Sequence, residues 1–188
     1  MFLLYNIIST IFLVISPLVI IVRMIIGKED TKRFLEKYSL NIKNKSSETI
    51  WFHGASIGEL MSILPLIKKF EKDKSIKKIL VTSSTISSAS IIKKIKFRKT
   101  AHVYYPFDVG FICNNFLNKW KPKIAIFVES EIWPNMFEKI DTKKIPLILI
   151  NARITNKSFN RWQICPTFAK QVFSKITIAL PQNRETKN

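Results

Sequence analysis

The sequence predicts an α/β fold whose core is an open, doubly wound parallel sheet, preceded by an N-terminal membrane helix. From residue 49 onward, short β-rich runs alternate with stretches of helical period, the order expected of repeated β-α-β units. Several of these runs are continuously apolar, which is typical of parallel strands buried on both faces. The first 26 residues are almost wholly apolar, and no charged side chain precedes Arg23.

The apolar run at residues 2–26 is long enough to cross a membrane, because a helix of that length covers about 35 Å at roughly 1.5 Å per residue. A cleaved signal peptide would need basic residues before the run and a small-residue cleavage site, but no Ala occurs before Ala55. We therefore expect an uncleaved anchor over residues 1–26. Two alternatives are a helix lying flat on the membrane surface and a buried core helix.

Charge asymmetry predicts the orientation of this anchor. The nearby basic residues lie at or beyond its end, and none precedes it: Arg23, Lys28, Lys32, Arg33 and Lys37. The positive-inside rule then puts everything after residue 26 in the cytoplasm.

The remaining chain divides into a linker and a domain. Residues 27–48 are expected to be a basic linker with a short helix at 30–38 and a polar loop at 41–48. Residues 49–188 are expected to form one Rossmann-like domain. The strand candidates are residues 49–53, 78–82, 101–105, 124–128, 146–150 and 176–180. Helical spacing appears at residues 60–67, with a kink expected at Pro65, at 111–120, from near Trp133, and at 159–173.

Composition narrows the class of protein. The chain has 188 residues, 47% of them apolar, which supports one domain with a real core and excludes wholesale disorder. The formal charge of +18 points to an anionic partner, either nucleic acid, acidic lipid or a phosphorylated substrate. The alternative is a Lys-rich composition that merely gives a solvated basic surface.

Cysteine and histidine usage predicts a reduced, intracellular protein without a metal. Cys113 and Cys165 lie far apart, and His53 and His102 are isolated, so no ligand spacing is present. The sequence has no P-loop, no G-x-G-x-x-G turn and no RNA-binding motif, so we expect no cofactor and no nucleic-acid partner.

Polar residues follow five of the predicted strands. Ligands of open parallel sheets bind beyond the carboxyl ends of the strands, so this pattern predicts a site at that edge. The segments concerned are residues 53–59, 82–85, 105–108, 129–131 and 151–153.

The first of these segments has two interpretations. Gly54 and Gly58 are two of only four glycines, which indicates a sharp turn or close approach of a ligand. Ser56 and Glu59 match the S-x-x-E pattern of a capping box, in which Glu59 would only accept a backbone N–H. Alternatively, the helix N-terminus keeps the Glu59 carboxylate ionised, as a general base requires.

Glu129 and Glu131 flank Ser130 at the end of another strand. Two neighbouring like charges repel, so at least one needs a cationic or hydrogen-bonding partner, for which Arg153 is a candidate. The alternative is that both carboxylates are surface caps of the helix that starts near Trp133.

Three sequence blocks together resemble the N-terminal, acceptor half of the Kdo transferase family, where Kdo is 3-deoxy-D-manno-octulosonic acid. The blocks are His53-Gly-Ala-Ser-Ile-Gly-Glu59, Glu129-Ser-Glu-Ile-Trp-Pro-Asn135 and Ile148-Leu-Ile-Asn-Ala-Arg153. Weaker matches are His102-Val-Tyr-Tyr-Pro-Phe-Asp108 and Phe116-Leu-Asn-Lys-Trp-Lys-Pro122. Their order and spacing hold from the apolar run to about Gln182.

The resemblance implies the N-terminal half of an inverting, metal-independent GT-B glycosyltransferase on the cytoplasmic face of the inner membrane. Such an enzyme transfers Kdo from CMP-Kdo, its donor substrate, to a lipid A precursor (lipid IVA) in lipopolysaccharide biosynthesis. It implies that Glu59 is the catalytic proton acceptor and that Glu129 stabilises the transition state. We assign substrate binding to Ser56, Gly58, Glu131 and Arg153, and we expect no metal.

The chain departs from the family pattern in two ways. Ile86 and Ser88 stand where the family usually has a Pro and a Gly. The resemblance implies that a C-terminal donor domain, which binds CMP-Kdo in the family, is absent from these residues, and we expect this chain alone to be inactive. The expected partners are the lipid A precursor, CMP-Kdo through the missing domain, and the anionic inner membrane. The alternatives are a non-catalytic membrane-bound remnant that binds lipid or a partner, and a membrane-tethered nucleic-acid binder.

Overall fold

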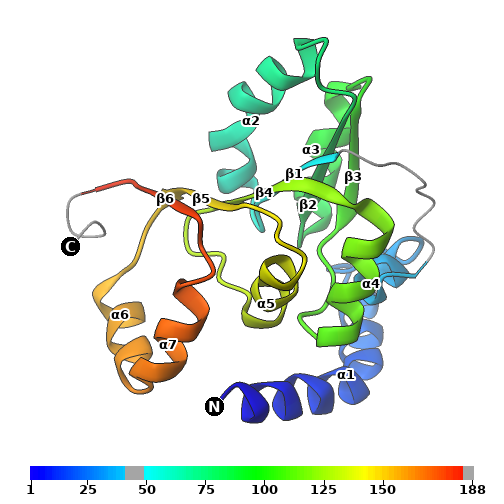
Figure 1. The fold of residues 1–188 in the computed structure, drawn as a ribbon. Coiled ribbons are helices and arrows are strands. Elements are labelled where there is room, and N and C mark those ends of the chain that lie inside the picture. Colours follow the sequence, from blue (N-terminus) through cyan, green and yellow to red (C-terminus); the bar gives the residue numbers. More distant parts are fainter. Residues whose placement is uncertain (41–48, 184–188) are drawn as a thin grey trace.

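The computed structural model describes residues 1–40 and 49–183. Its centre is a sheet of six parallel strands in the order β3-β2-β1-β4-β5-β6 (Figure 1). The strands are β1 (Thr49–His53), β2 (Lys78–Ser83), β3 (Thr100–Tyr104), β4 (Pro122–Val128), β5 (Leu147–Ala152) and β6 (Ile178–Pro181). Every neighbouring pair is parallel, which confirms the predicted α/β fold with an open parallel sheet.

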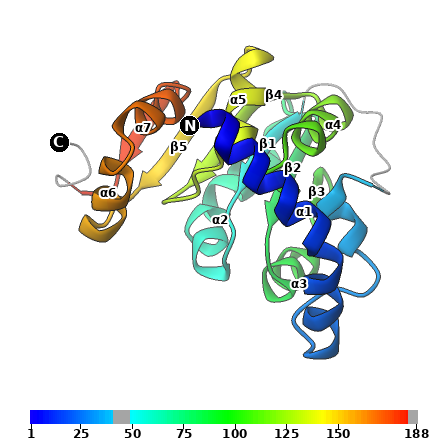
Figure 2. The ribbon, with the colours of Figure 1, turned by 90° about the horizontal axis from the view of Figure 1, so that it is seen from below.

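Helices cover both faces of the sheet (Figures 1 and 2). One face packs against α2 (Ile57–Lys72) and α3 (Ile86–Ile95), and the other against α4 (Gly110–Trp120), α5 (Pro134–Thr142) and α7 (Pro166–Phe173). Side chains alternate along each strand. Phe52 therefore packs on the side of α2 and α3, and its neighbour Trp51 on the side of α4, α5 and α7. The other elements are α1 (Phe2–Ile25), a 3-10 helix (Phe34–Tyr38) and α6 (Asn156–Gln163).

Two expected helices differ from those observed. The single helix expected at residues 159–173 is wrong: it is divided into α6 and α7, because Pro166 lacks the N–H needed to continue α6 and begins a new helix instead. Helix α2 contains Pro65, and the kink expected there stays a prediction. The short helix expected at 30–38 is a 3-10 helix, and the expected polar loop at 41–48 lies outside the described residues.

Helix α3 forms where no helix was assigned from the sequence. The Thr85 hydroxyl, at the N-cap, accepts a hydrogen bond from the Ser88 backbone N–H at 3.2 Å. Ser88 is one of the two residues in this loop that differ from the family pattern. It is buried, and its hydroxyl also bonds to the Thr85 hydroxyl at 2.6 Å. The loop after β2 therefore closes on itself through side-chain hydrogen bonds.

The apolar N-terminal run forms helix α1, which crosses the underside of the domain from beside α7 toward α3 (Figure 2). It has 24 residues with a window of mean hydropathy 2.4, so it is long and apolar enough to cross a membrane. Polar contacts attach it to the domain along its length, beginning with the Tyr5 hydroxyl, which donates to Asp108 Oδ2 at 2.7 Å.

Candidate active site

The polar segments that follow the strands meet at one edge of the sheet. His53 lies opposite Thr82 of β2 and Phe127 of β4, and Val128 lies opposite Ile150 of β5. Because all strands run in the same direction, the loops after β1, β4 and β5 leave the sheet at the same edge. The parallel topology therefore brings these polar segments together at the carboxyl ends of the strands, as predicted.

The loop after β1 turns tightly onto the start of α2. A Cβ atom on Gly54 would lie 3.2 Å from both Glu59 Cβ and Leu60 Cδ2, so any larger residue would force a shift there. A Cβ on Gly58 would meet only Ser56 Oγ, at 3.9 Å, and Gly58 is exposed. Packing thus favours glycine at position 54, whereas no neighbour within the described chain disfavours a side chain at position 58.

The Glu59 side chain is fixed at the N-terminus of α2. Its Oε2 accepts from the Ala55 backbone N–H at 2.8 Å, and its Oε1 accepts from the Ser56 hydroxyl at 2.7 Å. The Glu59 backbone N–H donates to Ser56 Oγ at 3.3 Å in return. The capping interpretation of the S-x-x-E pattern is therefore correct. It leaves room for further chemistry, since the side chain is half-buried and each carboxylate oxygen can accept a second hydrogen bond.

A buried chain of hydrogen bonds joins β1, β2 and the loop after β4 through His53. Trp51 Nε1 donates to Thr82 Oγ1 at 2.9 Å, and this oxygen lies 2.9 Å from His53 Nδ1. On the other side of the ring, His53 Nε2 lies 3.1 Å from Glu131 Oε2. Trp133 Nε1 donates to the same Glu131 oxygen at 2.9 Å.

The chemistry of these groups identifies the donors at both ends of this series of hydrogen bonds. The two indole N–H groups at its ends can only donate, so Thr82 Oγ1 and Glu131 Oε2 both accept from them. The Glu131 carboxylate can only accept, so His53 donates to it from Nε2. His53 Nδ1 faces Thr82 Oγ1 at 2.9 Å and the Thr82 carbonyl at 3.3 Å, and the Thr82 hydroxyl donates to the Phe52 carbonyl at 3.4 Å. These hydrogen bonds connect the end of β1, which leads into the helix that contains Glu59, to the loop that contains Glu129.

Tyr105 lies beneath the imidazole of His53. The two rings are stacked, with centroids 3.9 Å apart and an angle of 28° between their planes. Burial raises the pKa of Tyr105 well above its ordinary value, so its hydroxyl stays protonated. Within residues 1–40 and 49–183 this buried hydroxyl has no hydrogen-bond partner.

Glu131 serves the fold as well as the candidate site. Its Oε2 is committed to His53 and Trp133, and only 19% of its side chain is exposed. The partner that one of the two glutamates was expected to need is thus supplied by His53 and Trp133. Substrate binding by Glu131 stays a prediction.

Glu129 occupies an unusual backbone conformation at the end of β4. Its φ is +57°, in the left-handed region that side chains other than glycine rarely adopt, and Asn151 on neighbouring β5 has a φ of +51°. The Glu129 N–H donates to the Ile150 carbonyl at 3.0 Å, and Asn151 Nδ2 donates to Ser62 Oγ of α2 at 3.3 Å. Such strain is concentrated at functional sites, where the surrounding structure maintains it.

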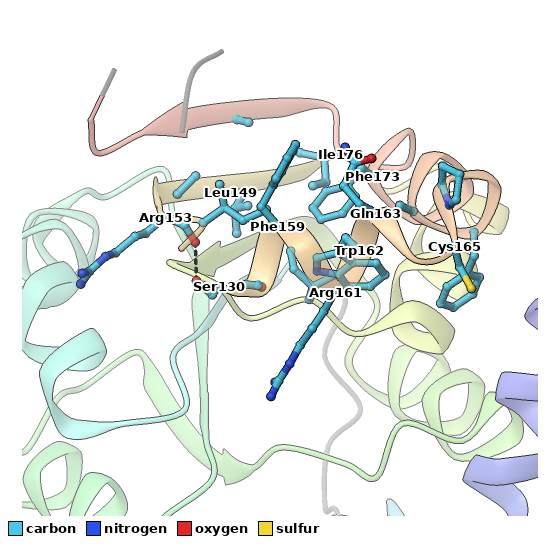
Figure 3. A pocket seen from close by; sticks show the side chains of 18 of the residues that line it. Ser130, Leu149, Arg153, Phe159, Arg161, Trp162, Gln163, Cys165, Phe173 and Ile176 are labelled. Carbon is cyan, nitrogen blue, oxygen red and sulfur yellow. Dashed lines mark hydrogen bonds between the residues drawn. The ribbon is translucent and has the colours of Figure 1, made fainter. Parts of the chain in front are cut away.

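A pocket of about 880 Å³ opens beside these strand ends (Figure 3). Glu129, Ser130 and Arg153 line it on the side of the sheet. Its other walls come mainly from α6, α7 and β6 and are largely apolar: Phe159, Trp162, Ile164, Phe168, Phe173, Ile176 and Ala179 are among them. The first residue of the chain, Met1, also lines it. The pocket is therefore a mostly apolar hollow with charged groups at the edge of the sheet.

The structure separates the predicted site residues into three groups. Glu129 and Arg153 line the pocket, Ser56, Gly58 and Glu59 form the first turn of α2, and Glu131 belongs to the His53 hydrogen-bond chain.

Arg153 does not neutralise either glutamate, since no ion pair joins it to them within the described chain. Its carbonyl instead accepts a hydrogen bond from the Ser130 hydroxyl. Figure 3 shows its side chain extending away from the aromatic residues of the pocket.

Five residues of the hydrogen-bond chain and its support were not assigned a role from the sequence: His53, Thr82, Tyr105, Trp51 and Trp133. The first three stand in the polar segments that follow strands, which was the signal available. Their mutual contacts depend on strand register and so were not readable from spacing. Among the residues described, no group of three or more His, Cys, Asp or Glu could hold a metal ion.

These observations define a class of protein: a doubly wound α/β domain with carboxylates and an open pocket at the carboxyl edge of its sheet. Comparison with known proteins then gives the family. Residues 31–188 match the model of the 3-Deoxy-D-manno-octulosonic-acid transferase (kdotransferase) family, and the chain belongs to that family. This confirms the resemblance found in the sequence blocks.

Individual relatives support the same family assignment. The chain is 37% identical over 161 residues to a 3-deoxy-D-manno-octulosonic acid transferase of Rickettsia bellii, an alignment that covers 85% of the chain and 38% of the relative. It is 36% identical over 152 residues to a probable mitochondrial 3-deoxy-D-manno-octulosonic acid transferase of Arabidopsis thaliana, covering 79% of the chain and 34% of that protein. A Haemophilus influenzae transferase of the same name is 27% identical over 81% of the chain and 36% of its own length. The chain therefore spans well under half of the length of these curated relatives.

Proposed function

We propose that this chain is the acceptor-binding half of an inverting, metal-independent GT-B Kdo transferase of lipopolysaccharide biosynthesis. The transferred group is Kdo, the donor substrate is CMP-Kdo, and the acceptor is a hydroxyl of a lipid A precursor. The observation that carries the proposal is the position of Glu59, a capped carboxylate at a helix N-terminus on the ligand-binding edge of a domain of this family. No cofactor enters the proposed reaction.

Glu59 is the proposed general base. Its bonds to the Ala55 N–H and the Ser56 hydroxyl orient the carboxylate at the N-terminus of α2. The acceptor hydroxyl would donate to Oε1, beside or in place of the exposed Ser56 hydroxyl. As the oxygen of the acceptor hydroxyl forms a bond to the anomeric carbon of Kdo, the proton of that hydroxyl passes to Glu59. The bond from the anomeric carbon to the CMP phosphate oxygen breaks in the same step.

Glu129 is proposed to stabilise the positive charge that develops on the sugar in the transition state. Its strained backbone and its place on the pocket wall support this role. Arg153, exposed at the same edge, is proposed to bind an anionic group of the acceptor or donor, and Ser56 and Gly58 to contact the acceptor.

The large pocket suits an acylated acceptor. Apolar walls favour hydrocarbon chains, and Met1 brings the start of the apolar helix α1 to the same pocket. A lipid leaving the membrane beside α1 could therefore insert an acyl chain there while its sugar reaches the sheet edge. We propose accordingly that α1 attaches the protein to the inner membrane and that the domain lies on the cytoplasmic face.

A transfer assay tests this function. Membranes containing the chain, together with the part of the Rickettsia bellii relative that follows its matched region, would be supplied with CMP-Kdo and lipid A precursor. The proposal requires Kdo-labelled lipid from the pair and a loss of at least about 100-fold with Glu59→Gln. If the chain binds the precursor but no pairing yields product, it is a non-catalytic lipid-binding protein.

A further inference from the structure

We propose that helix α1 does not cross the bilayer but lies along its surface, half-embedded among anionic lipids, with the domain resting on its other side. The inference builds on the membrane attachment proposed above and adds an orientation to it. It favours the flat-lying alternative over the spanning anchor, and it rests on which side of α1 the domain occupies.

One stripe of α1 is attached to the domain by polar side chains. Tyr5 donates to Asp108 at 2.7 Å, Ser9 Oγ accepts from Asn135 Nδ2 at 3.2 Å, and Ser16 bonds to the Tyr38 hydroxyl at 2.8 Å. Arg23 lies on the same face, and its Nε donates at 3.0 Å to Glu29 of the linker that directly follows the helix. Positions 5, 9, 16 and 23 recur at helical spacing, so they lie on one face.

Ring contacts add to these hydrogen bonds, and together they hold the helix from Phe2 to Ser16. Phe12 packs edge-on against Phe107 with centroids 5.7 Å apart, and Phe2 packs likewise against Phe168 at 5.7 Å. A helix that crossed the hydrocarbon could not keep these contacts unless the domain entered the membrane with it. Breaking them would leave the carboxylate of Asp108, which is almost completely buried, without the Tyr5 hydroxyl.

The opposite stripe is apolar and open. Leu3, Val14 and Ile25 are 74%, 78% and 79% exposed, and other large apolar side chains of the same face are also exposed: Ile7, Ile11, Leu18 and Ile21. These positions follow helical spacing two residues out of step with the attached stripe, which places them about 200° away from it at about 100° per residue. A continuous exposed apolar stripe of this length is typical of a surface that contacts a membrane or another protein.

Charge at the end of α1 indicates that the stripe contacts an anionic lipid surface. Lys28 and Lys32 are exposed, whereas the acidic groups of the same segment are used inside the fold. Glu29 binds both Arg23 and Lys37, at 3.0 and 2.7 Å, and Asp30 accepts from backbone N–H groups. The exposed charge beside the apolar stripe is therefore positive, which suits anionic head groups.

Depth measurements test this orientation directly. Spin labels would be attached at Leu3→Cys, Val14→Cys and Ile25→Cys, each in the full chain with Cys165→Ser, in vesicles containing phosphatidylglycerol. Because the apolar face of a surface helix enters only about 5–10 Å, all three labels should lie at a similar shallow depth. A label at Lys94→Cys on α3 serves as the control and should remain in water.

The spanning arrangement gives a different profile. The label at position 14 would then lie near the bilayer centre, about 15 Å deep, with positions 3 and 25 near opposite surfaces, and this result would overturn the proposal. Labels that remain in water in the presence of vesicles would overturn it as well. A Lys28→Glu, Lys32→Glu variant should bind phosphatidylglycerol vesicles several-fold more weakly, without losing the helical circular dichroism signal. None of these readouts uses transfer activity, so the orientation and the proposed reaction fail separately.

Discussion

His53 Nε2 lies 3.1 Å from Glu131 Oε2, and this contact joins the last residue of β1 to the loop after β4. Strand β1 leads into the first turn of α2, which contains Glu59, and the loop after β4 contains Glu129; these are the two carboxylates proposed for catalysis. The loop after β4 packs Ile132 and Trp133 against the core, and the buried hydrogen bonds around His53 connect this loop to the end of β1. We regard His53 and Glu131 as positioning residues.

The first prediction concerns the strength of this contact. Glu131→Ala leaves the N–H groups of His53 and Trp133 without their acceptor, and we expect it to lower the free energy of unfolding by about 1–3 kcal/mol. His53→Ala should cost at least as much, because the ring is fully buried. A double-mutant cycle measured by urea unfolding in detergent should give a coupling of about 0.5–3 kcal/mol.

A nearby carboxylate provides the control. Glu129 is exposed enough to line the pocket and has no side-chain hydrogen bond within the described chain, so Glu129→Gln should change stability by less than about 0.5 kcal/mol. Additive effects of the His53 and Glu131 variants would show that the contact does not hold the two loops together.

A second prediction compares the two glycines of the loop after β1. Gly54→Ala brings a Cβ within 3.2 Å of Glu59 and Leu60 and should destabilise the protein by about 1–3 kcal/mol. Gly58→Ala meets open space in the first turn of α2, so stability should be unchanged or slightly raised. If Gly58 faces the acceptor, the Gly58→Ala variant should nevertheless bind lipid A precursor more weakly. Equal stability of the two variants in thermal unfolding would contradict the packing argument.

The third prediction concerns the pH dependence of stability. Burial, and the neighbouring Arg33, lower the pKa of His102 to about 3. Arg33 can only donate, so its contact with His102 Nδ1 at 3.3 Å requires that nitrogen to be unprotonated, while Nε2 donates to Ser83 Oγ at 2.8 Å.

Below its ordinary pKa of about 6.5, the unfolded chain binds a proton at this histidine that the folded chain does not. Stability should therefore fall as pH decreases from about 6.5 toward 3, by at most about 1.4 kcal/mol per pH unit. Urea unfolding at several pH values should show a shallower loss in His102→Gln. An unchanged slope in that variant would mean that His102 is not the group responsible.

The sequence-based prediction captured the parts of the fold that depend on local pattern. The parallel sheet follows from the apolar runs, and the capping box from Ser56 and Glu59. The helix expected at 159–173 was wrong because its apolar periodicity continued across Pro166, although the proline itself was the signal for a break. Contacts such as His53 with Glu131 depend on the register between strands far apart in sequence, which periodicity does not encode.

Long-range electrostatics were harder still to predict. Arg153 was expected to balance Glu129 or Glu131, but the left-handed backbone at Glu129 and the bond from Ser130 to the Arg153 carbonyl arrange these loops differently. For α1, length and hydropathy alone predicted a spanning helix. The polar residues on one face were visible in the sequence, but their partners in the domain were not.

The fourth prediction separates the capping role of Glu59 from catalysis. Gln retains an oxygen that can accept the Ala55 N–H, so Glu59→Gln should change stability little, whereas Glu59→Ala should cost about 1 kcal/mol through the lost cap. Both variants remove the base, so both should lose transfer activity by a similar factor. If Glu59→Gln kept its transfer activity and only the less stable Glu59→Ala lost it, Glu59 would act only as a cap.

The most direct test of the account is therefore the rate of Kdo transfer to lipid A precursor by Glu59→Gln, measured in the complemented assay beside the unchanged chain at equal folded concentration. The account predicts a rate lowered by at least about 100-fold with the fold and lipid binding retained. A Glu59→Gln chain that transfers Kdo at the rate of the unchanged chain would contradict it.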